Sequence, residues 1–236
     1  MNPYQKLQNR KRTWTPVQTT AGKLNEGSEE TIYRALAMRH MELPVGSFIQ
    51  DALSEIPVLS ADLLKSNVKD EENHDLALGY IANALGVDET AEAEAKRLRD
   101  AWQAHPDHTV LKALVAERAI FFVLLPFFRF NGDAGLRTVS ADISRDEQVH
   151  VAANSLVCKE LGLEISPSLD KLRKATINWV MTPLKSSTNK YLDKKFWLDA
   201  SDRLMYEGKA PELSDTKRAR MPAFFEHANP NLPQYA

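Results

Sequence analysis

The sequence contains a single cysteine, Cys158, among 236 residues. One cysteine excludes an internal disulfide and any cysteine-rich metal site, and it is consistent with the reducing cytoplasm, where we expect the protein to reside. An excess of charge of one sign is also missing, because the formal net charge is only −2. The composition therefore predicts that the protein binds neither nucleic acid nor a membrane surface.

Long hydrophobic runs are missing as well. The most apolar stretch, AIFFVLLPFF at residues 119–128, is shorter than the roughly 20 residues that span a bilayer, and it predicts a fully buried helix. The N-terminus has no apolar run, so we expect no signal peptide. With 43 % apolar and 26 % charged residues, the chain predicts a single globular domain over residues 1–236 with a sizeable core.

Glycine is scarce, with nine residues, and most of the glycines fall at breaks in a helical pattern. Long alternation of apolar and polar residues is absent, so the sequence predicts an all-α helical bundle. We expect an irregular N-terminal segment over residues 1–27 and a tail over residues 208–236. Between them, helices are predicted from Ser28 to a break at Pro44 and Gly46, then over 47–57, 61–86, 91–104, 110–130, up to Gly162, 167–185 and 189–207.

Two of the six histidines follow a glutamate by three residues, as Glu71–His74 and Glu147–His150. Three residues make about one helical turn, so each carboxylate shares a helix face with its imidazole. A solvated surface pair is the simplest interpretation of either pair taken alone. However, each pair lies near the middle of a long predicted helix, which makes a metal site the alternative.

A third long helix between the two pairs carries Glu117 directly before the apolar run. A lone carboxylate is costly to bury there without a partner. Glu117 can find that partner in Arg118 or Arg129, or it can bind a metal ion. One further acid, Glu42, lies at the end of the first predicted helix.

The order of these residues along the chain is acid helix, Glu-x-x-His, acid helix, Glu-x-x-His. Ferritin-like dimetal proteins take one glutamate from each of two helices and a Glu-x-x-His pair from each of two others. The sequence therefore predicts a ferritin-like bundle with a dinuclear Fe/Fe, Mn/Fe or Mn/Mn centre. Glu30 and His40 lie on the same predicted helix as Glu42 and compete with it. The six predicted ligands are Glu42, Glu71, His74, Glu117, Glu147 and His150.

The segments AERAIFFVLLPFFRF and ISRDEQVHVAANSL resemble the core of the ribonucleotide reductase small subunit, the radical-generating partner of that enzyme. Arg145, Asp146, Glu147 and His150 match the Arg-Asp-Glu-x-x-His motif of that family. Trp14, in TWTP, is similar to the tryptophan of the family's Trp-x-Pro segment. The resemblance covers residues 12–160 and suits a compact, phage-type member.

This resemblance implies a class I small (beta) subunit whose dimetal centre activates an oxidant. It implies that the oxidising equivalent passes to a large (alpha) catalytic subunit that makes deoxyribonucleotides, and that the small subunit is a homodimer. It also implies a relay through His74, Asp146 and Trp14, with Asp146 orienting a ligating histidine. Tyr235, near the C-terminus, is the candidate for the family's relay tyrosine.

The sequence departs from the family at one position. Many members carry the radical tyrosine four residues after the first histidine, where this chain has Leu78. Leu78 is consistent with members that store the oxidising equivalent on a mixed manganese–iron centre. It also leaves open a stand-alone ferritin-like oxidase or oxygenase that acts on a small substrate, or a non-catalytic helical module.

Overall fold

The computed structural model describes residues 2–213, and this part of the chain is helical and contains no β-strand. The all-α prediction is therefore confirmed. The predicted helices are found with shifted ends; α10, for example, begins only after the Asp193 cap. The α-helices are α1 (Pro3–Gln8), α2 (Glu29–Ala37), α3 (Glu42–Ala52), α4 (Ala61–Leu85), α5 (Glu89–Ala104), α6 (Thr109–Ala116), α7 (Phe122–Asn131), α8 (Ala134–Glu160), α9 (Pro167–Met181) and α10 (Lys194–Glu207).

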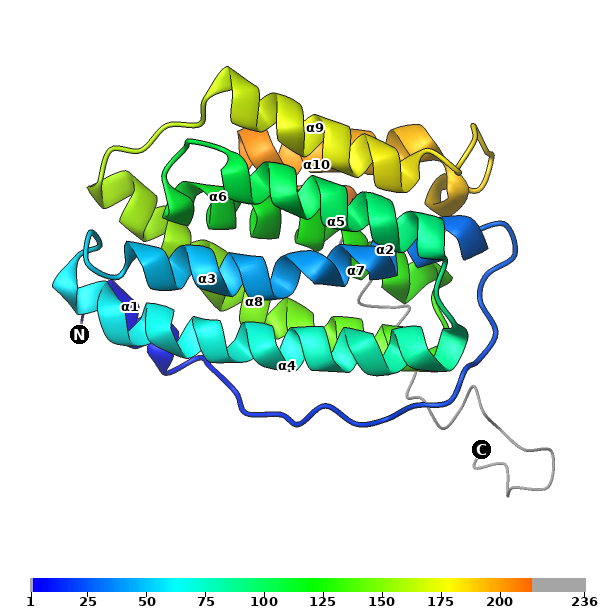
Figure 1. Ribbon diagram of the computed structural model, residues 1–236, viewed down its shortest axis with the longest axis horizontal. Helices are drawn as coiled ribbons and strands as arrows, with labels where there is room; N and C mark the ends of the chain where they lie inside the picture. The colour runs from blue at the N-terminus through cyan, green and yellow to red at the C-terminus, as the bar shows by residue number, and fades with distance from the viewer. Residues whose placement is uncertain (1, 214–236) are drawn as a thin grey trace.

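The centre of the bundle consists of α3, α4, α8 and the continuous segment from α6 to α7. Helix α3 packs on α4 and α6, and α8 packs on α4, α6 and α7. Helices α9 and α10 lie on the side away from α4 (Figure 1). Residues 9–27, which we call the N-terminal strap, are extended and run along the length of α4 (Figure 1). Within the described range, no helix has both the length and the apolar character needed to span a bilayer.

The N-terminal segment is not irregular throughout, so the prediction for residues 1–27 is wrong at Pro3–Gln8, which form α1. Asn2 caps this helix by accepting a hydrogen bond from a first-turn backbone N–H. The buried Tyr4 hydroxyl donates to Glu160 Oε1 on α8 at 2.7 Å. A six-residue helix is too short to be stable by itself, so it depends on this packing and leaves little periodicity in the sequence.

The predicted helix break at Pro44 and Gly46 is also wrong, because both residues lie inside α3, which begins at Glu42. Proline is tolerated in the first turn, where its missing N–H would have no helical partner. The chain turns earlier, at the 3₁₀ turn Met38–Met41. A Cβ on Gly46 would lie 3.5 Å from the Glu71 side chain, an ordinary van der Waals distance, so Gly46 lies where α3 packs against α4 beside that carboxylate.

The helix predicted over residues 110–130 contains a π-helical turn, Glu117–Phe121, between α6 and α7. Such turns recur at functional sites because they shift side chains around the helix axis. Helix α10 contacts this turn directly, since the buried Ser201 hydroxyl donates to the Ala119 carbonyl oxygen at 2.6 Å. The turn places Glu117, its first residue, at the centre of the bundle.

Replacing Gly132 by alanine is expected to destabilise the protein by about 1–3 kcal/mol, the usual cost of overpacking. A Cβ at this position would lie 2.5 Å from the Phe128 carbonyl oxygen and 2.6 Å from Leu136 Cβ. Urea unfolding followed by circular dichroism measures the loss. Gly79→Ala is the control, because a Cβ at this α4 position meets nothing within 4 Å. Equal stability of Gly132→Ala and the wild type would contradict the packing after α7.

Candidate metal centre

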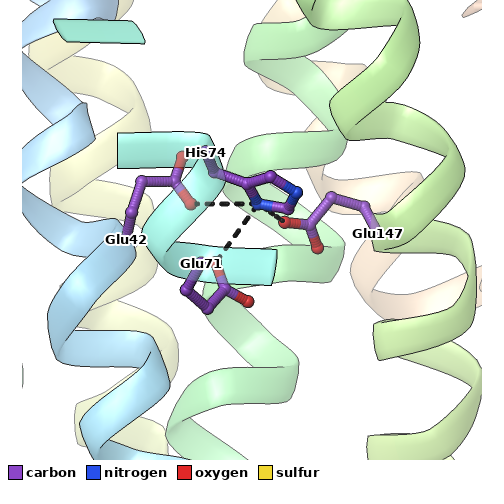
Figure 2. A group of neighbouring side chains, drawn as sticks. All are labelled: Glu42, Glu71, His74 and Glu147. Atoms are coloured by element: carbon purple, nitrogen blue, oxygen red, sulfur yellow. Dashed lines mark ion pairs between the residues drawn. The ribbon is translucent and has the colours of Figure 1, made fainter. Parts of the chain in front are cut away.

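Six polar side chains converge in the interior of the bundle, and each is at most 1 % exposed. Figure 2 shows Glu42, Glu71 and Glu147 around the His74 ring. The structure thus brings together all the residues that the sequence predicts as ligands. They are Glu42 at the start of α3, Glu71 and His74 on α4, Glu117 at the start of the π turn, and Glu147 and His150 on α8.

One half of the cluster surrounds His74. Its Nδ1 atom lies 3.3 Å from a Glu71 oxygen, 3.5 Å from a Glu147 oxygen and 3.6 Å from a Glu42 oxygen. One ligand atom from each of these four residues lies within 4.8 Å of all the others. This spacing is compact enough for the four side chains to share one metal ion.

The other half surrounds His150. Its Nδ1 atom lies 3.0 Å from a Glu71 oxygen and 3.9 Å from a Glu117 oxygen, and these three residues form a second group within 4.8 Å. The two imidazole rings have centroids 5.7 Å apart. Glu71 belongs to both groups, so its carboxylate lies between the two candidate metal positions.

Apart from the ion-pair contacts among themselves, the inward-facing atoms of the cluster have no hydrogen-bond partner, although they are buried. Burying a polar atom without a partner is costly, so such atoms need an explanation. Carboxylate oxygens with one imidazole nitrogen at each position suit metal ions of the iron or manganese kind. The donor set therefore fits a metal site. The unpartnered atoms include Glu42 Oε2, both Glu71 oxygens, His74 Nδ1, Glu117 Oε1, both Glu147 oxygens and His150 Nδ1.

Each histidine has a carboxylate behind it, on the far side of the ring from the cluster. His74 Nε2 lies 3.2 Å from Asp146 Oδ2, and His150 Nε2 lies 2.9 Å from Asp70 Oδ2. Metal-ligating histidines commonly donate their second N–H to a carboxylate, which orients the ring. Sequence analysis predicted Asp146 in this place and missed Asp70. The sequence did contain a signal for Asp70, because it directly precedes Glu71, just as Asp146 directly precedes Glu147.

Trp14 extends this arrangement to the N-terminal strap. Its Nε1 donates to Asp146 Oδ2 at 2.7 Å, and its ring stacks against His74 with centroids 6.2 Å apart and an interplanar angle of 18°. The structure thus joins Trp14, Asp146 and His74 into one hydrogen-bonded set. Tyr235, the other predicted relay residue, lies outside the described residues.

Asn154 is a further residue that sequence analysis missed. It lies one turn after His150 on α8, is fully buried, and its Nδ2 donates to Glu117 Oε2 at 2.8 Å. This bond leaves the other Glu117 oxygen directed to the cluster without a partner. Only its i+4 spacing from His150 marked it in the sequence, and many helical residues share that spacing.

Without metal, the cluster retains protons. Burial raises the pKa of Glu42, Glu117 and Glu147, and neighbouring carboxylates add to the effect. Burial acts to lower the pKa of His74 and His150, but the surrounding carboxylates outweigh it and raise both values. Metal ligands must be deprotonated, so these protons compete with metal.

Metal binding is therefore expected to release protons and to weaken as the pH falls. Groups with a raised pKa hold their protons up to a higher pH than usual, so the affinity for metal should fall steadily as the pH is lowered. Calorimetric titration with Mn²⁺ in buffers of different ionisation enthalpy counts the protons released, and at least one per ion is expected. The same heat in every buffer would contradict the protonated metal-free state.

The helices and their carboxylate–histidine cluster define an all-α, ferritin-like bundle. A crystal structure from Bacillus halodurans, described as that of a proposed class I ribonucleotide reductase, has the same fold. It matches with a TM-score of 0.59 over 92 % of this chain and 98 % of that chain, at 16 % sequence identity. No protein-family model and no curated protein matches the sequence.

Proposed function

We propose that this chain is the small subunit of a class I ribonucleotide reductase and that its cluster holds a dinuclear centre of iron, manganese or both. The observation that carries the proposal is the hydrogen-bonded set of Trp14, Asp146 and His74 leading outward from the cluster. A metal site that serves only for storage has no need of an oxidisable indole tied to one ligand. When bound, the centre would supply the oxidising equivalent.

The protein's own residues have distinct tasks in this proposal. Glu71 would supply carboxylate oxygens to both metal ions, and each histidine would supply one neutral nitrogen. Asp146 orients the His74 ring and accepts the Trp14 N–H. Asp146 also lines a cavity of about 420 Å³ between the strap and α8, so the relay reaches the surface of the bundle. A large catalytic subunit and a second copy of this chain are the proposed partners.

A stand-alone ferritin-like oxidase or oxygenase is the second candidate, and Leu78 is the observation that favours it. Leu78 lies one turn after His74 on α4 and is 4 % exposed. An aliphatic side chain cannot hold a radical as tyrosine does. This leaves the metals, Trp14 or the substrate itself to be oxidised. Such an enzyme would turn over without a partner subunit.

Metal reconstitution followed by electron paramagnetic resonance tests the proposal. The purified chain would be loaded with Fe²⁺, Mn²⁺ or both and exposed to air, then mixed with the large reductase subunit of the same source. We expect a mixed-metal or protein radical signal and ribonucleotide reduction that requires both subunits. Asp146→Asn keeps a side-chain oxygen to accept from His74 but removes the negative charge, so it should greatly reduce this activity while the metal content after reconstitution with excess metal stays close to that of the wild type.

The contrary outcome is equally defined. A silent, oxidised centre with no radical and no activity alongside the large subunit would favour the oxidase or oxygenase. Purified protein with well under one metal ion per chain, unchanged by Glu71→Ala, would contradict both candidates.

A further inference from the structure

The N-terminal strap contacts the carboxylates behind both histidines, but it does so through two different kinds of side chain. Trp14 donates to Asp146, as described above. Lys11, three residues earlier, forms an ion pair with Asp70. A neutral indole and a cation thus occupy corresponding places on the two sides of the cluster.

Lys11 is a fixed side chain. It is 12 % exposed, and its Nζ donates to Ser66 Oγ at 2.8 Å and to Asn67 Oδ1 at 3.0 Å. Together with Asp70, these contacts occupy the three N–H groups of the ammonium. These partners lie on two successive turns of α4, and Asp70 directly precedes the first Glu-x-x-His pair. A lysine with three fixed partners differs from a solvated surface cation, whose side chain keeps its rotamer freedom.

One carboxylate oxygen of Asp70 links Lys11 to the cluster. Asp70 Oδ2 meets Lys11 Nζ and also lies 2.9 Å from His150 Nε2. Since His150 Nδ1 faces the cluster on the other side of the ring, the Nε2 proton must point to this oxygen. A carboxylate that is held by Lys11 presents its acceptor in one direction, and the ring orientation follows from it.

We propose that Lys11 is a positioning residue for the metal position formed by His150 and Glu117. Lys11 holds Asp70, Asp70 holds the imidazole ring, and the ring presents Nδ1 to the metal. This inference rests on the proposed dinuclear centre, and it deepens that proposal by making the strap a part of metal binding. It follows that loss of Lys11 weakens one metal position and leaves the other unchanged.

Variants that each retain one position test this inference. Glu42→Ala should leave the His150 position, and Glu117→Ala should leave the His74 position. Anaerobic titration with Mn²⁺ alone, with free ion followed by electron paramagnetic resonance, gives the affinity in each background. We expect Lys11→Met to weaken Mn²⁺ binding about tenfold in the Glu42→Ala background. This is the lower end of the loss in affinity that is typical when a residue behind a metal ligand is removed. The Glu117→Ala background should be unchanged by it.

Two further variants separate positioning from folding. Lys11→Arg keeps the cation and should retain most of the affinity. Arg12→Met removes the next cation along the strap, which is exposed, and should leave both positions at wild-type affinity. The melting temperature of each metal-free protein reports on the fold. Equal weakening in both backgrounds, or weakening that accompanies a lower melting temperature of the metal-free protein, would overturn the proposal.

Failure of the inference can be told from failure of the dinuclear centre. A wild-type chain that binds fewer than two Mn²⁺ ions contradicts the centre, and the role of Lys11 falls with it. A wild-type chain that binds two ions, together with a Lys11→Met variant that binds both as tightly, contradicts only the role of Lys11.

Discussion

Replacing Glu71 by alanine is expected to abolish the binding of both metal ions. Its carboxylate belongs to both candidate groups, 3.3 Å from the nitrogen of His74 and 3.0 Å from that of His150. Each position would then lose the carboxylate that lies nearest to its histidine nitrogen, and the negative charge between the two cations would be reduced. Loss of a shared ligand therefore costs more than loss of a ligand at one position.

Two clustered glutamates that each belong to a single group provide the comparison for this expectation. Glu42 and Glu117 each belong to one group only, so Glu42→Ala and Glu117→Ala should each retain one metal ion. Elemental analysis of protein reconstituted with Mn²⁺ gives the ratio of ions to chains. Glu72→Ala is the matched control, because this neighbouring glutamate points outward and pairs with Lys69 on the surface. A Glu71→Ala variant that retains two ions would contradict the assignment of the cluster.

The six clustered residues could be predicted because each carries a local signal or completes an ordered set. The two Glu-x-x-His pairs share a helix face at a spacing that any helix imposes, and Glu117 stands out as an acid before an apolar run. Glu42 had no signal of its own and was chosen because the pattern needed an acid on the first helix. The structure places its carboxylate in the cluster because α3 begins at Glu42 and packs along α4.

The outer contacts of the cluster were harder to predict, because they join distant segments. Asp70 meets His150 from 80 residues away, and Lys11 meets its α4 partners across more than 50 residues. Helical periodicity describes neighbours on one face of one helix and contains no information about such pairs. The strap is extended and without periodicity, so its register along α4 is set by tertiary contacts. Trp14 was found only through the family resemblance.

The errors in helix boundaries have the same origin. Pro44 was read as a helix breaker, although proline breaks a helix only where an N–H partner is needed. The π turn was not predicted, since one additional residue in a turn barely disturbs an apolar pattern that is continuous around the helix. This turn is nonetheless what carries Glu117, and its Ala119 carbonyl is held by Ser201 from α10, a helix outside the four-segment centre.

Trp197→Ala is expected to lower the free energy of unfolding by about 3–5 kcal/mol, the usual cost of removing a large aromatic side chain from a core. Trp197 on α10 is fully buried. Its ring packs edge-on against those of Phe127 and Phe196, with ring centroids 5.2 Å and 4.9 Å apart. Its Nε1 also donates to the Tyr191 carbonyl oxygen at 3.1 Å. Truncation removes these contacts and leaves that oxygen without its donor.

Urea unfolding of the metal-free protein measures this loss without a contribution from metal binding. Trp179→Ala is the matched control, because Trp179 is only half-buried and one face of its ring lies under Arg34 at 5.5 Å. Trp197→Phe keeps an aromatic ring and should fall between the wild type and Trp197→Ala, which preserves the test if the alanine variant does not fold. A loss below about 1 kcal/mol, typical of a surface change, would contradict the packing of α10 on α7. Because α10 also carries Ser201, a destabilised α10 should loosen the π turn and weaken metal binding at the Glu117 position first.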